Sequence, residues 1–298
     1  MTPTPDDRFP DARRSASTCG PVAMVGGGQM ALALAEGFCR ARLLAPADIV
    51  VHDPSEEARK RLADRVPGVR FAPAAADVVR GAGIVFLAVK PQQAEAACRA
   101  FAAALPPAAT VVSIVAGVPI DTLTAWLGTA RVVRVMPNTP CLVGHGVSAW
   151  SRGPAVTEEA ARTAAALLSA VGSAHEVPEH LLDAVTGLSG SGPGYVALVV
   201  EALADGGVKA GLPRALALSL AAATVAGTGT LIEQSGEHPA VIRDRVASPG
   251  GTTIAGLAVL ENRGVRGAII DAVGAAADRA RALGSASTPT GPGRGTPG

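Results

Sequence analysis

Short apolar runs alternate with helical patterns from Pro21 to about Pro178, and this alternation restricts the possible folds more than any other feature. The runs are mostly continuous stretches of apolar residues, which is typical of strands buried on both faces of a sheet. Strands separated by helices form parallel sheets. The strands are predicted at Val22–Val25, Ile49–His52, Val69–Phe71, Ile84–Val89, Thr110–Ile114 and Arg131–Val135.

Helical spacing of apolar residues predicts the remaining elements. Two short strands at Val147–Trp150 and His175–Val177 are expected to extend the sheet edge around a helix at Thr157–Val171. After about Glu179 the strand signal stops, so the second part is predicted to be all helical. The helices expected within the first part are Gln29–Leu43, Ser55–Val66, Gln92–Leu105 and Ile120–Leu127.

The predicted fold class is therefore α/β, with an N-terminal Rossmann-type parallel-sheet domain followed by an all-α dimerisation domain. We place the first domain at residues 21–178 and the second at residues 179–284. Proline-rich or low-complexity composition predicts disordered tails at residues 1–20 and 285–298.

A glycine-rich turn joins the first predicted strand to the first predicted helix. Its GxGxxA spacing allows a tight turn at Gly26, close approach of a pyrophosphate at Gly28 and close helix packing at Ala31. The start of the helix adds free N–H groups and partial positive charge. In this strand–helix context the turn predicts dinucleotide binding, although a glycine-rich turn alone can be purely structural. The predicted cofactor residues here are Gly26, Gly27, Gly28, Gln29, Met30 and Ala31.

Two further loops follow the carboxyl ends of predicted strands, where doubly wound sheets bind ligands. They contain Ala88, Val89, Lys90 and Pro91 after the fourth strand, and Val115, Ala116 and Gly117 after the fifth. Lys90 can equally be a solvated surface lysine.

A second glycine-rich turn, SPGGTT at residues 248–253, opens a helical segment near the C-terminus. Consecutive N–H groups at a helix start form an anion site, and threonine adds a hydroxyl that can donate or accept. A small carboxylate fits this chemistry. The structural alternative is a tight N-cap in which Ser or Thr binds the first helical amides.

Residues 215–232 are uncharged over a length close to that of a membrane span. They consist mostly of small residues, so we expect a helix buried in a homodimer rather than in a membrane. A net charge of +1 gives no broad footprint for nucleic acid. The four cysteines are scattered and the histidines lack metal-ligand spacing, which favours a cytoplasmic protein with no metal.

Taken together, the motifs closely resemble pyrroline-5-carboxylate reductases. The matching segments, in order from Pro21 to Leu283, are the GxGxxA turn, AVKP, RVMPNTP, GLSGSGPGY, ALADGGVKAGLP and HPAVIRDRVASPGGTT. This resemblance implies NAD(P)H-dependent reduction of 1-pyrroline-5-carboxylate to L-proline, the last step of proline biosynthesis. It also implies a helical domain that forms dimers, which often assemble further.

The resemblance implies that the three N-terminal loops line NADP or NAD and that Gly251, Thr252 and Thr253 hold a cyclic imino acid. Thr253 is the candidate catalytic residue, contacting the ring nitrogen. The sequence departs from the family at Gly194, where alanine is usual, and at Cys141, where a small aliphatic residue is common. Neither departure removes a group that the chemistry needs.

Two alternatives remain open from the sequence. One is a related hydroxyacid dehydrogenase or imine reductase; such dehydrogenases usually need a catalytic lysine, and Lys209 is the only lysine in the second part. The other is a non-catalytic dinucleotide sensor, which would have no reason to keep SPGGTT.

The choice between the two nicotinamide cofactors depends on Asp53, which directly follows the second predicted strand. A carboxylate there binds the ribose 2′-OH of NADH and repels the 2′-phosphate of NADPH. Asp53-Pro54-Ser55-Glu56 also has the pattern of an N-cap, a first-turn proline and a capping-box glutamate. If Asp53 is only a cap, Arg59 or Lys60 could still attract a phosphate. We expect NADH to be well used and both cofactors to be accepted.

Overall fold

The computed structural model describes residues 20–286, so the predicted tails lie almost entirely outside the described residues. Contacts divide the chain into two compact units. The first unit contains the described residues up to Gly190 together with those from Ala276 onward, and the second unit is Ser191–Ala275.

An eight-stranded sheet forms the first unit, with the strand order β3-β2-β1-β4-β5-β6-β7-β8. The strands β1 to β6 are parallel, β7 is antiparallel to β6, and β8 is parallel to β7. All six predicted core strands and both predicted edge strands are confirmed. Their bounds are β1 Val22–Val25, β2 Ile49–His52, β3 Arg70–Phe71, β4 Ile84–Leu87, β5 Thr110–Ser113, β6 Val132–Met136, β7 Gly146–Arg152 and β8 Gly172–Glu176.

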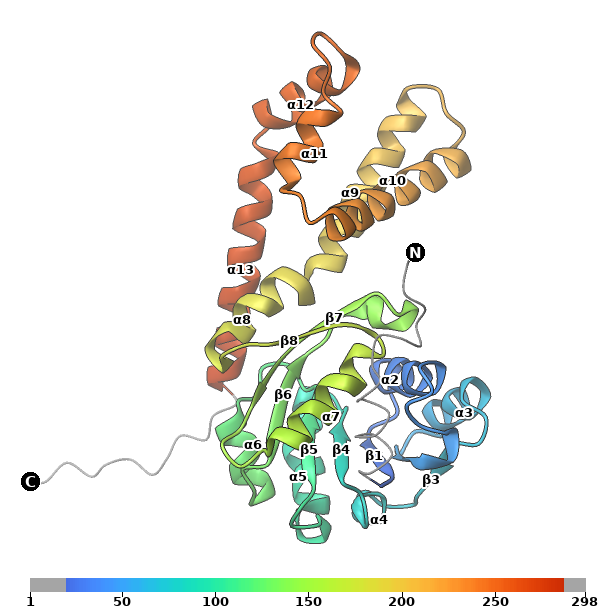
Figure 1. Cartoon of the computed structure of the whole chain (residues 1–298), viewed down its shortest axis with the longest axis vertical. Coiled ribbons are helices and arrows are strands. Elements are labelled where there is room, and N and C mark those ends of the chain that lie inside the picture. Colours follow the sequence, from blue (N-terminus) through green and yellow to red (C-terminus); the bar gives the residue numbers. More distant parts are fainter. Residues whose placement is uncertain (1–19, 287–298) are drawn as a thin grey trace, which may run out of the picture. The chain divides into compact units, whose positions relative to one another are not determined.

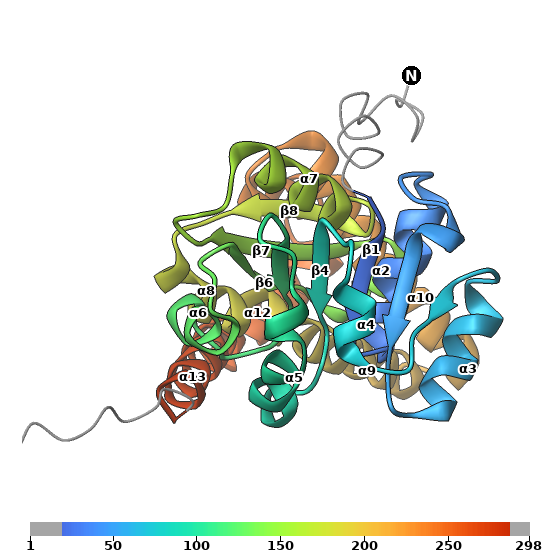
Figure 2. The same ribbon diagram turned by 90° about the horizontal axis from the view of Figure 1, so that it is seen from below.

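Helices cover both faces of this sheet (Figures 1 and 2). On one face α2, α3 and α7 share a core with alternate strand residues such as Met24 and Phe86. On the other face α4, α5 and α6 pack on the intervening residues, such as Val25 and Leu87. The helices are α2 Gln29–Arg40, α3 Glu56–Arg65, α4 Ala75–Val79, α5 Ala94–Phe101, α6 Ile120–Leu127, α7 Glu158–Ser169 and α8 Leu182–Val185.

Several helix boundaries differ from the sequence prediction. The helix α2 ends at Arg40 rather than Leu43, because Arg42 adopts a left-handed φ of 55° and the N–H of Leu43 turns back to the carbonyl of Phe38. The region predicted as one helix, Gln92–Leu105, is a short α5 flanked by 3-10 turns. The helix α4 was missed because five residues are too few to show helical periodicity.

The N-cap of α3 is Ser55, whose hydroxyl accepts the N–H of Ala58 at 3.2 Å. The capping pattern that places the cap at Asp53 is therefore wrong. The carboxylate of Asp53 lies outside the helix and accepts other backbone amides, described below.

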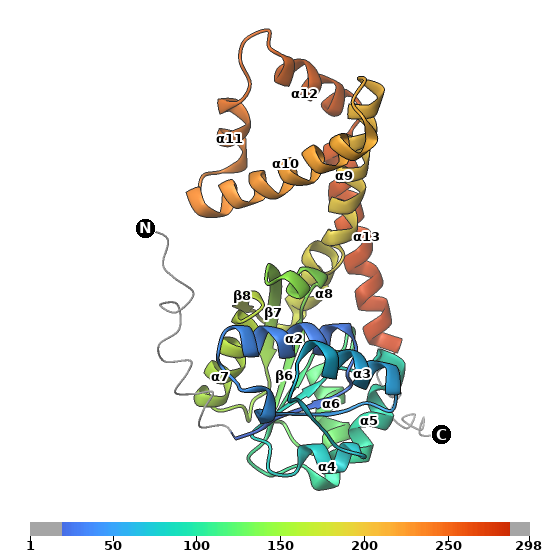
Figure 3. The ribbon, with the colours of Figure 1, turned by 90° about the vertical axis from the view of Figure 1, so that its right-hand side faces the viewer.

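Every described element of the second unit is helical, as predicted (Figure 3). The helices α9 and α10 pack together around Ala204, Ala217 and Ala221, which are buried. The bounds are α9 Gly192–Lys209, α10 Arg214–Ser235, α11 Pro239–Arg245, α12 Thr252–Asn262 and α13 Val265–Ala286, of which the last part belongs to the first unit.

Much of the apolar surface of the second unit is exposed within one chain. In α10 only Ala217 and Ala221 are buried. Among the described residues, α10 is the one helix long and apolar enough to cross a membrane, judged by length and composition alone. Exposed large apolar residues of this unit include Leu198, Leu203, Leu216, Leu218, Leu220, Leu231, Val259, Leu260 and Ile270.

The boundary predicted between residues 178 and 179 differs from the division by contacts. The segment after residue 178 contains α8, which contacts β6 and β7 and so belongs to the first unit. Whether residues 179–284 fold as a unit of their own stays a prediction. The end of α13 also packs on the first unit, because a Cβ on Gly284 would lie 3.1 Å from the carbonyl oxygen of Gly117.

Candidate nucleotide and substrate sites

Two glycines in the turn between β1 and α2 have different roles. Gly26 has a φ of +102°, and a Cβ there would lie 2.5 Å from the carbonyl oxygen of Ala88. Its N–H donates to the carbonyl of His52 at 2.8 Å. Gly26 therefore allows β1, β2 and the β4 loop to meet closely, which a side chain would prevent.

Gly28 faces open space instead. It is the N-cap of α2, its φ is −69°, and a Cβ added there would meet no atom within 4 Å. No side chain caps the first turn of α2, so the N–H groups at this helix start are available to an anion. An open cradle before an uncapped helix is what a pyrophosphate group requires.

The other predicted nucleotide loops lie at the same edge of the sheet. Because β1, β4 and β5 are neighbours, the loops that follow them lie side by side. A Cβ added to Gly26 would meet Ala88 and Val89. Lys90 and Ala116 are exposed, and Gly117 has a φ of +75°. The structure thus gathers the three loops, and the role of each residue in binding stays a prediction.

Asp53 holds the glycine-rich turn in place. Its Oδ2 accepts the N–H of Gly27 at 2.6 Å and its Oδ1 accepts the N–H of Ser55 at 2.8 Å. Arg59 reaches the same residue, since its Nη1 donates to the backbone carbonyl of Asp53 at 2.6 Å. Lys60 instead pairs with Asp64 at 2.8 Å and points to solvent.

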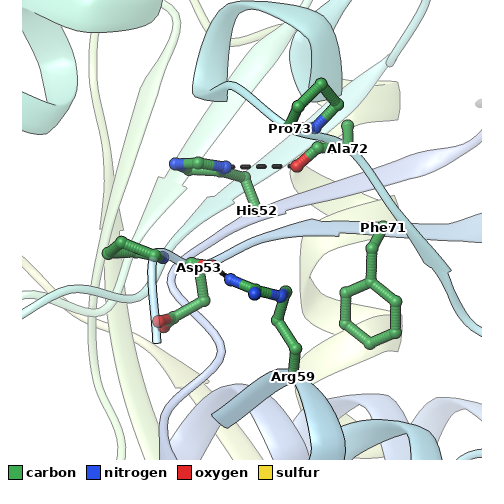
Figure 4. Close-up of a pocket in the computed structure, with 7 residues that line it drawn as sticks. His52, Asp53, Arg59, Phe71, Ala72 and Pro73 are labelled. Carbon is green, nitrogen blue, oxygen red and sulfur yellow. Dashed lines mark hydrogen bonds between the residues drawn. The ribbon is translucent and has the colours of Figure 1, made fainter. Parts of the chain in front are cut away.

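A pocket of about 450 Å³ lies beside Asp53 at the end of β2 (Figure 4). Arg59 and Asp53 supply its charges. Sequence reasoning pointed to both of these but missed His52, which also faces the pocket. The lining residues are His52, Asp53, Pro54, Arg59, Phe71, Ala72 and Pro73.

The glycine-rich SPGGTT turn at residues 248–253, at the start of α12, also lacks a side-chain cap. Gly251 is the N-cap and no side chain bonds to the first turn, so the N-cap alternative that needs a Ser or Thr cap is not observed. Gly250 has a φ of +65° and open space beside it. Thr253 is half-buried and Thr252 is exposed. The helix start therefore presents free amides and a hydroxyl, the groups that bind a carboxylate.

Gly190, in the GLSGSGPGY segment at residues 187–195, has a structural role. A Cβ on Gly190 would lie 2.4 Å from the Cε atom of Met136. Asn138 is buried, and its side chain donates to the carbonyl of Ser189 at 3.1 Å and accepts the N–H of Val147 at 2.8 Å. These contacts tie the MPNTP loop to the segment that leads into α9.

Tyr195 also has a packing role. Its hydroxyl donates to the backbone carbonyl of Ala272 at 3.3 Å, which joins α9 to α13 within the second unit.

A buried arginine cluster lies beneath the α8 segment, and no sequence pattern indicated it. Arg134, in β6, is 8% exposed and its guanidinium contacts Glu179 at 3.0 Å and Asp183 at 3.5 Å. The same Glu179 oxygen accepts the N–H of Ile120 at 2.8 Å and so caps α6. One cluster therefore fixes both the start of α6, just after the Val115–Gly117 loop, and the chain leading to α8.

The thiol of Cys98, in α5, is fully buried. Burial raises the pKa of the Cys98 thiol to about 12, so this thiol stays protonated at neutral pH. Among the described residues, no cluster of His, Cys, Asp and Glu could hold a metal ion.

A largely parallel sheet with an uncapped, glycine-lined helix start after its first strand gives the first unit the architecture of a dinucleotide-binding domain. Residues 21–117 match the family described as NADP oxidoreductase, coenzyme F420-dependent. Residues 179–283 match the family described as pyrroline-5-carboxylate reductase dimerisation.

Relatives that match over nearly their whole length belong to the same reductase family as the dimerisation match. The chain is 46% identical to a pyrroline-5-carboxylate reductase of Synechocystis over 263 residues, which cover 88% of this chain and 98% of the relative. The structure of pyrroline-5-carboxylate reductase from Coxiella burnetii matches with a TM-score of 0.84 at 31% identity, covering 89% and 99% of the two chains. Plasmodium falciparum pyrroline carboxylate reductase, solved with NADP bound, matches with a TM-score of 0.80 at 30% identity and covers 89% and 98%. This chain belongs to the pyrroline-5-carboxylate reductase family, which confirms the resemblance in its motifs.

Proposed function

We propose that the protein reduces 1-pyrroline-5-carboxylate to L-proline with NADPH or NADH. The observation that carries this proposal is the pair of uncapped, glycine-lined helix starts, at Gly28 and at Gly251. One suits a pyrophosphate and the other suits a small carboxylate. Family membership identifies the cyclic imino acid as the substrate that brings the carboxylate.

The nicotinamide cofactor supplies a hydride when it is bound. The first turn of α2 would bind its pyrophosphate, and the loops after β4 and β5 would line it. The first turn of α12, with Gly251, Thr252 and Thr253, would bind the substrate carboxylate. The hydroxyl of Thr253 would contact the ring nitrogen and hold the C=N bond in a fixed orientation. An iminium substrate already carries the proton that the product amine keeps, so the chain need not supply a strong acid.

A steady-state assay with 1-pyrroline-5-carboxylate and each reduced nicotinamide tests this proposal. We expect saturable turnover with both cofactors and none with a 2-hydroxy acid and oxidised cofactor. Lys209 ends α9 and is exposed, so the dehydrogenase alternative, which needs a catalytic lysine, gains no support from its position. Nucleotide binding without any turnover would instead favour the dinucleotide sensor.

We further propose that the chain is a cytoplasmic homodimer and that dimers assemble further. The support is the uncovered apolar surface on α9, α10, α12 and α13, together with a family described by its dimerisation. A second copy covers such a surface without a membrane or nucleic-acid partner.

Sedimentation at micromolar protein should then detect no folded monomer. Leu218→Asp, on exposed α10, should shift the protein to unfolded or aggregated species, because it puts a charge into the proposed interface. The matched control is Leu142→Asp, an exposed leucine in the first unit, which should stay dimeric. A stable, folded wild-type monomer would rule out the dimer proposal.

Asp53→Ser is expected to raise kcat/KM for NADPH relative to NADH, by about tenfold for each 1.4 kcal/mol of repulsion relieved. The carboxylate lines the pocket, and both of its oxygens accept neutral backbone amides, so its negative charge remains at the pocket. Asp53→Asn is the control that keeps an acceptor for Gly27 and removes the charge, so it should shift the ratio in the same direction. A fixed ratio with lower thermal stability would mean that Asp53 only supports the loop.

A further inference from the structure

His52 ends β2 and faces the pocket described above. Its Nδ1 lies 3.2 Å from the carbonyl oxygen of Ala72. Because a carbonyl oxygen can only accept, Nδ1 is the donor in this contact and Nε2 is the ring nitrogen left available to a ligand. Figure 4 shows the Nδ1 edge facing Ala72 and the opposite edge turned away from it. Within residues 20–286 the structure gives Nε2 no hydrogen-bond partner.

The charged groups around His52 are compatible with a bound anion, because they include arginines and the acidic groups already have partners. Asp53 and Arg59 line the same pocket, and both oxygens of Asp53 already accept backbone amides. Arg70 stands on β3 opposite Val50, on the same sheet face as His52. From the other elements, β1 contributes no titratable residue, and Asp77 of α4 pairs with Arg80 at 3.1 Å.

We propose that His52 binds the 2′-phosphate of NADPH, so that cofactor preference depends on pH. This proposal rests on the proposed function only in that the nucleotide binds with its adenosine end at this pocket, beside the carboxyl end of β2. An imidazolium at Nε2 adds a positive charge and a donor next to the site where NADPH has a phosphate and NADH a neutral hydroxyl. Arg59 supplies positive charge at every pH, and His52 supplies it only when protonated.

The expected change of NADPH preference with pH has a sign that the charge of the cofactor's own 2′-phosphate cannot produce. Histidine side chains lose their charge as pH rises between about 5 and 8, which lowers the preference for NADPH. A phosphate monoester, with a second pKa near 6, gains negative charge over the same range, which would raise that preference through Arg59. A preference for NADPH that falls as pH rises therefore identifies a protein group.

Calorimetric binding of NADP⁺ and NAD⁺ at pH 6, 7 and 8 measures this preference without turnover. For the wild type we expect the ratio of the two affinities to fall by about fivefold from pH 6 to pH 8, in the range of a partly exposed charge pair. His52→Gln keeps a polar side chain without the charge and should give a flat or rising ratio. The control, His175→Gln, lies on β8 at the opposite sheet edge and should behave like the wild type.

A second measurement needs no variant. In buffers of different ionisation enthalpy, NADP⁺ binding near pH 7 should take up protons relative to NAD⁺ binding. A wild-type ratio that rises with pH, net proton release, or an unchanged fall in His52→Gln would overturn the assignment to His52. Normal binding ratios with no reduction of 1-pyrroline-5-carboxylate would overturn the proposed reaction and leave the role of His52 intact.

Discussion

Gly28→Ala should leave the first unit folded and weaken binding of NADP⁺ and NAD⁺ by roughly ten- to a hundredfold. Alanine adopts the φ of −69° at this position without strain, and no protein atom lies within 4 Å of the new methyl group. That methyl would occupy the space through which the pyrophosphate approaches the first turn of α2. Forcing a group into an occupied space costs about 1–3 kcal/mol, which gives the stated range. Calorimetry and a thermal melt on the same sample measure both effects.

Gly26→Ala is the matched control, because it adds the same methyl two residues earlier. There the φ of +102° disfavours alanine and the methyl would lie 2.5 Å from the carbonyl oxygen of Ala88. We expect a clear loss of thermal stability, which Gly28→Ala should not cause. Unchanged nucleotide affinity in a folded Gly28→Ala protein would mean that the pyrophosphate binds elsewhere.

Thr253→Val should lower kcat/KM for 1-pyrroline-5-carboxylate by about ten- to a hundredfold while nucleotide affinity stays near normal. Valine keeps the shape and removes only the hydroxyl proposed to contact the ring nitrogen, at a cost of about 1–3 kcal/mol. Thr163→Val is the control, since its hydroxyl bonds only to the carbonyl of Glu159 within α7. Unchanged kcat/KM in Thr253→Val would remove this residue from the site.

The sheet could be predicted almost completely because its strands are apolar on both faces. Val22–Val25 and Ile84–Leu87 are buried along their whole length, so they stand out in the sequence as uninterrupted apolar runs. The edge strand β8 is partly exposed and its predicted start was three residues late. The predicted end of α2 was wrong because Arg42 adopts a left-handed backbone conformation that the spacing of apolar residues does not reveal.

The parts of the candidate sites that are formed by residues close together in the sequence could be predicted. The glycine patterns around Gly28 and Gly251 located both uncapped helix starts. The contacts made by Arg134 could not be predicted, because its partners Glu179 and Asp183 lie more than 40 residues away and follow no local pattern. Likewise, the position after the second predicted strand pointed to Asp53 without revealing that its carboxylate accepts two backbone amides.

The return of α13 to the first unit has a consequence for how the chain folds as it is synthesised. The residues of all eight strands have been synthesised once Glu176 has been added. The residues from Ala276 onward, which belong to the same unit, follow roughly a hundred residues later. That delay is about 5–20 s at ordinary elongation rates. During that interval the nascent nucleotide-binding unit waits without its last packing element beside Gly117. The N-terminal unit therefore completes its packing only after the C-terminal residues have been synthesised. A ribosome that stalls within the helical segment leaves both units incomplete.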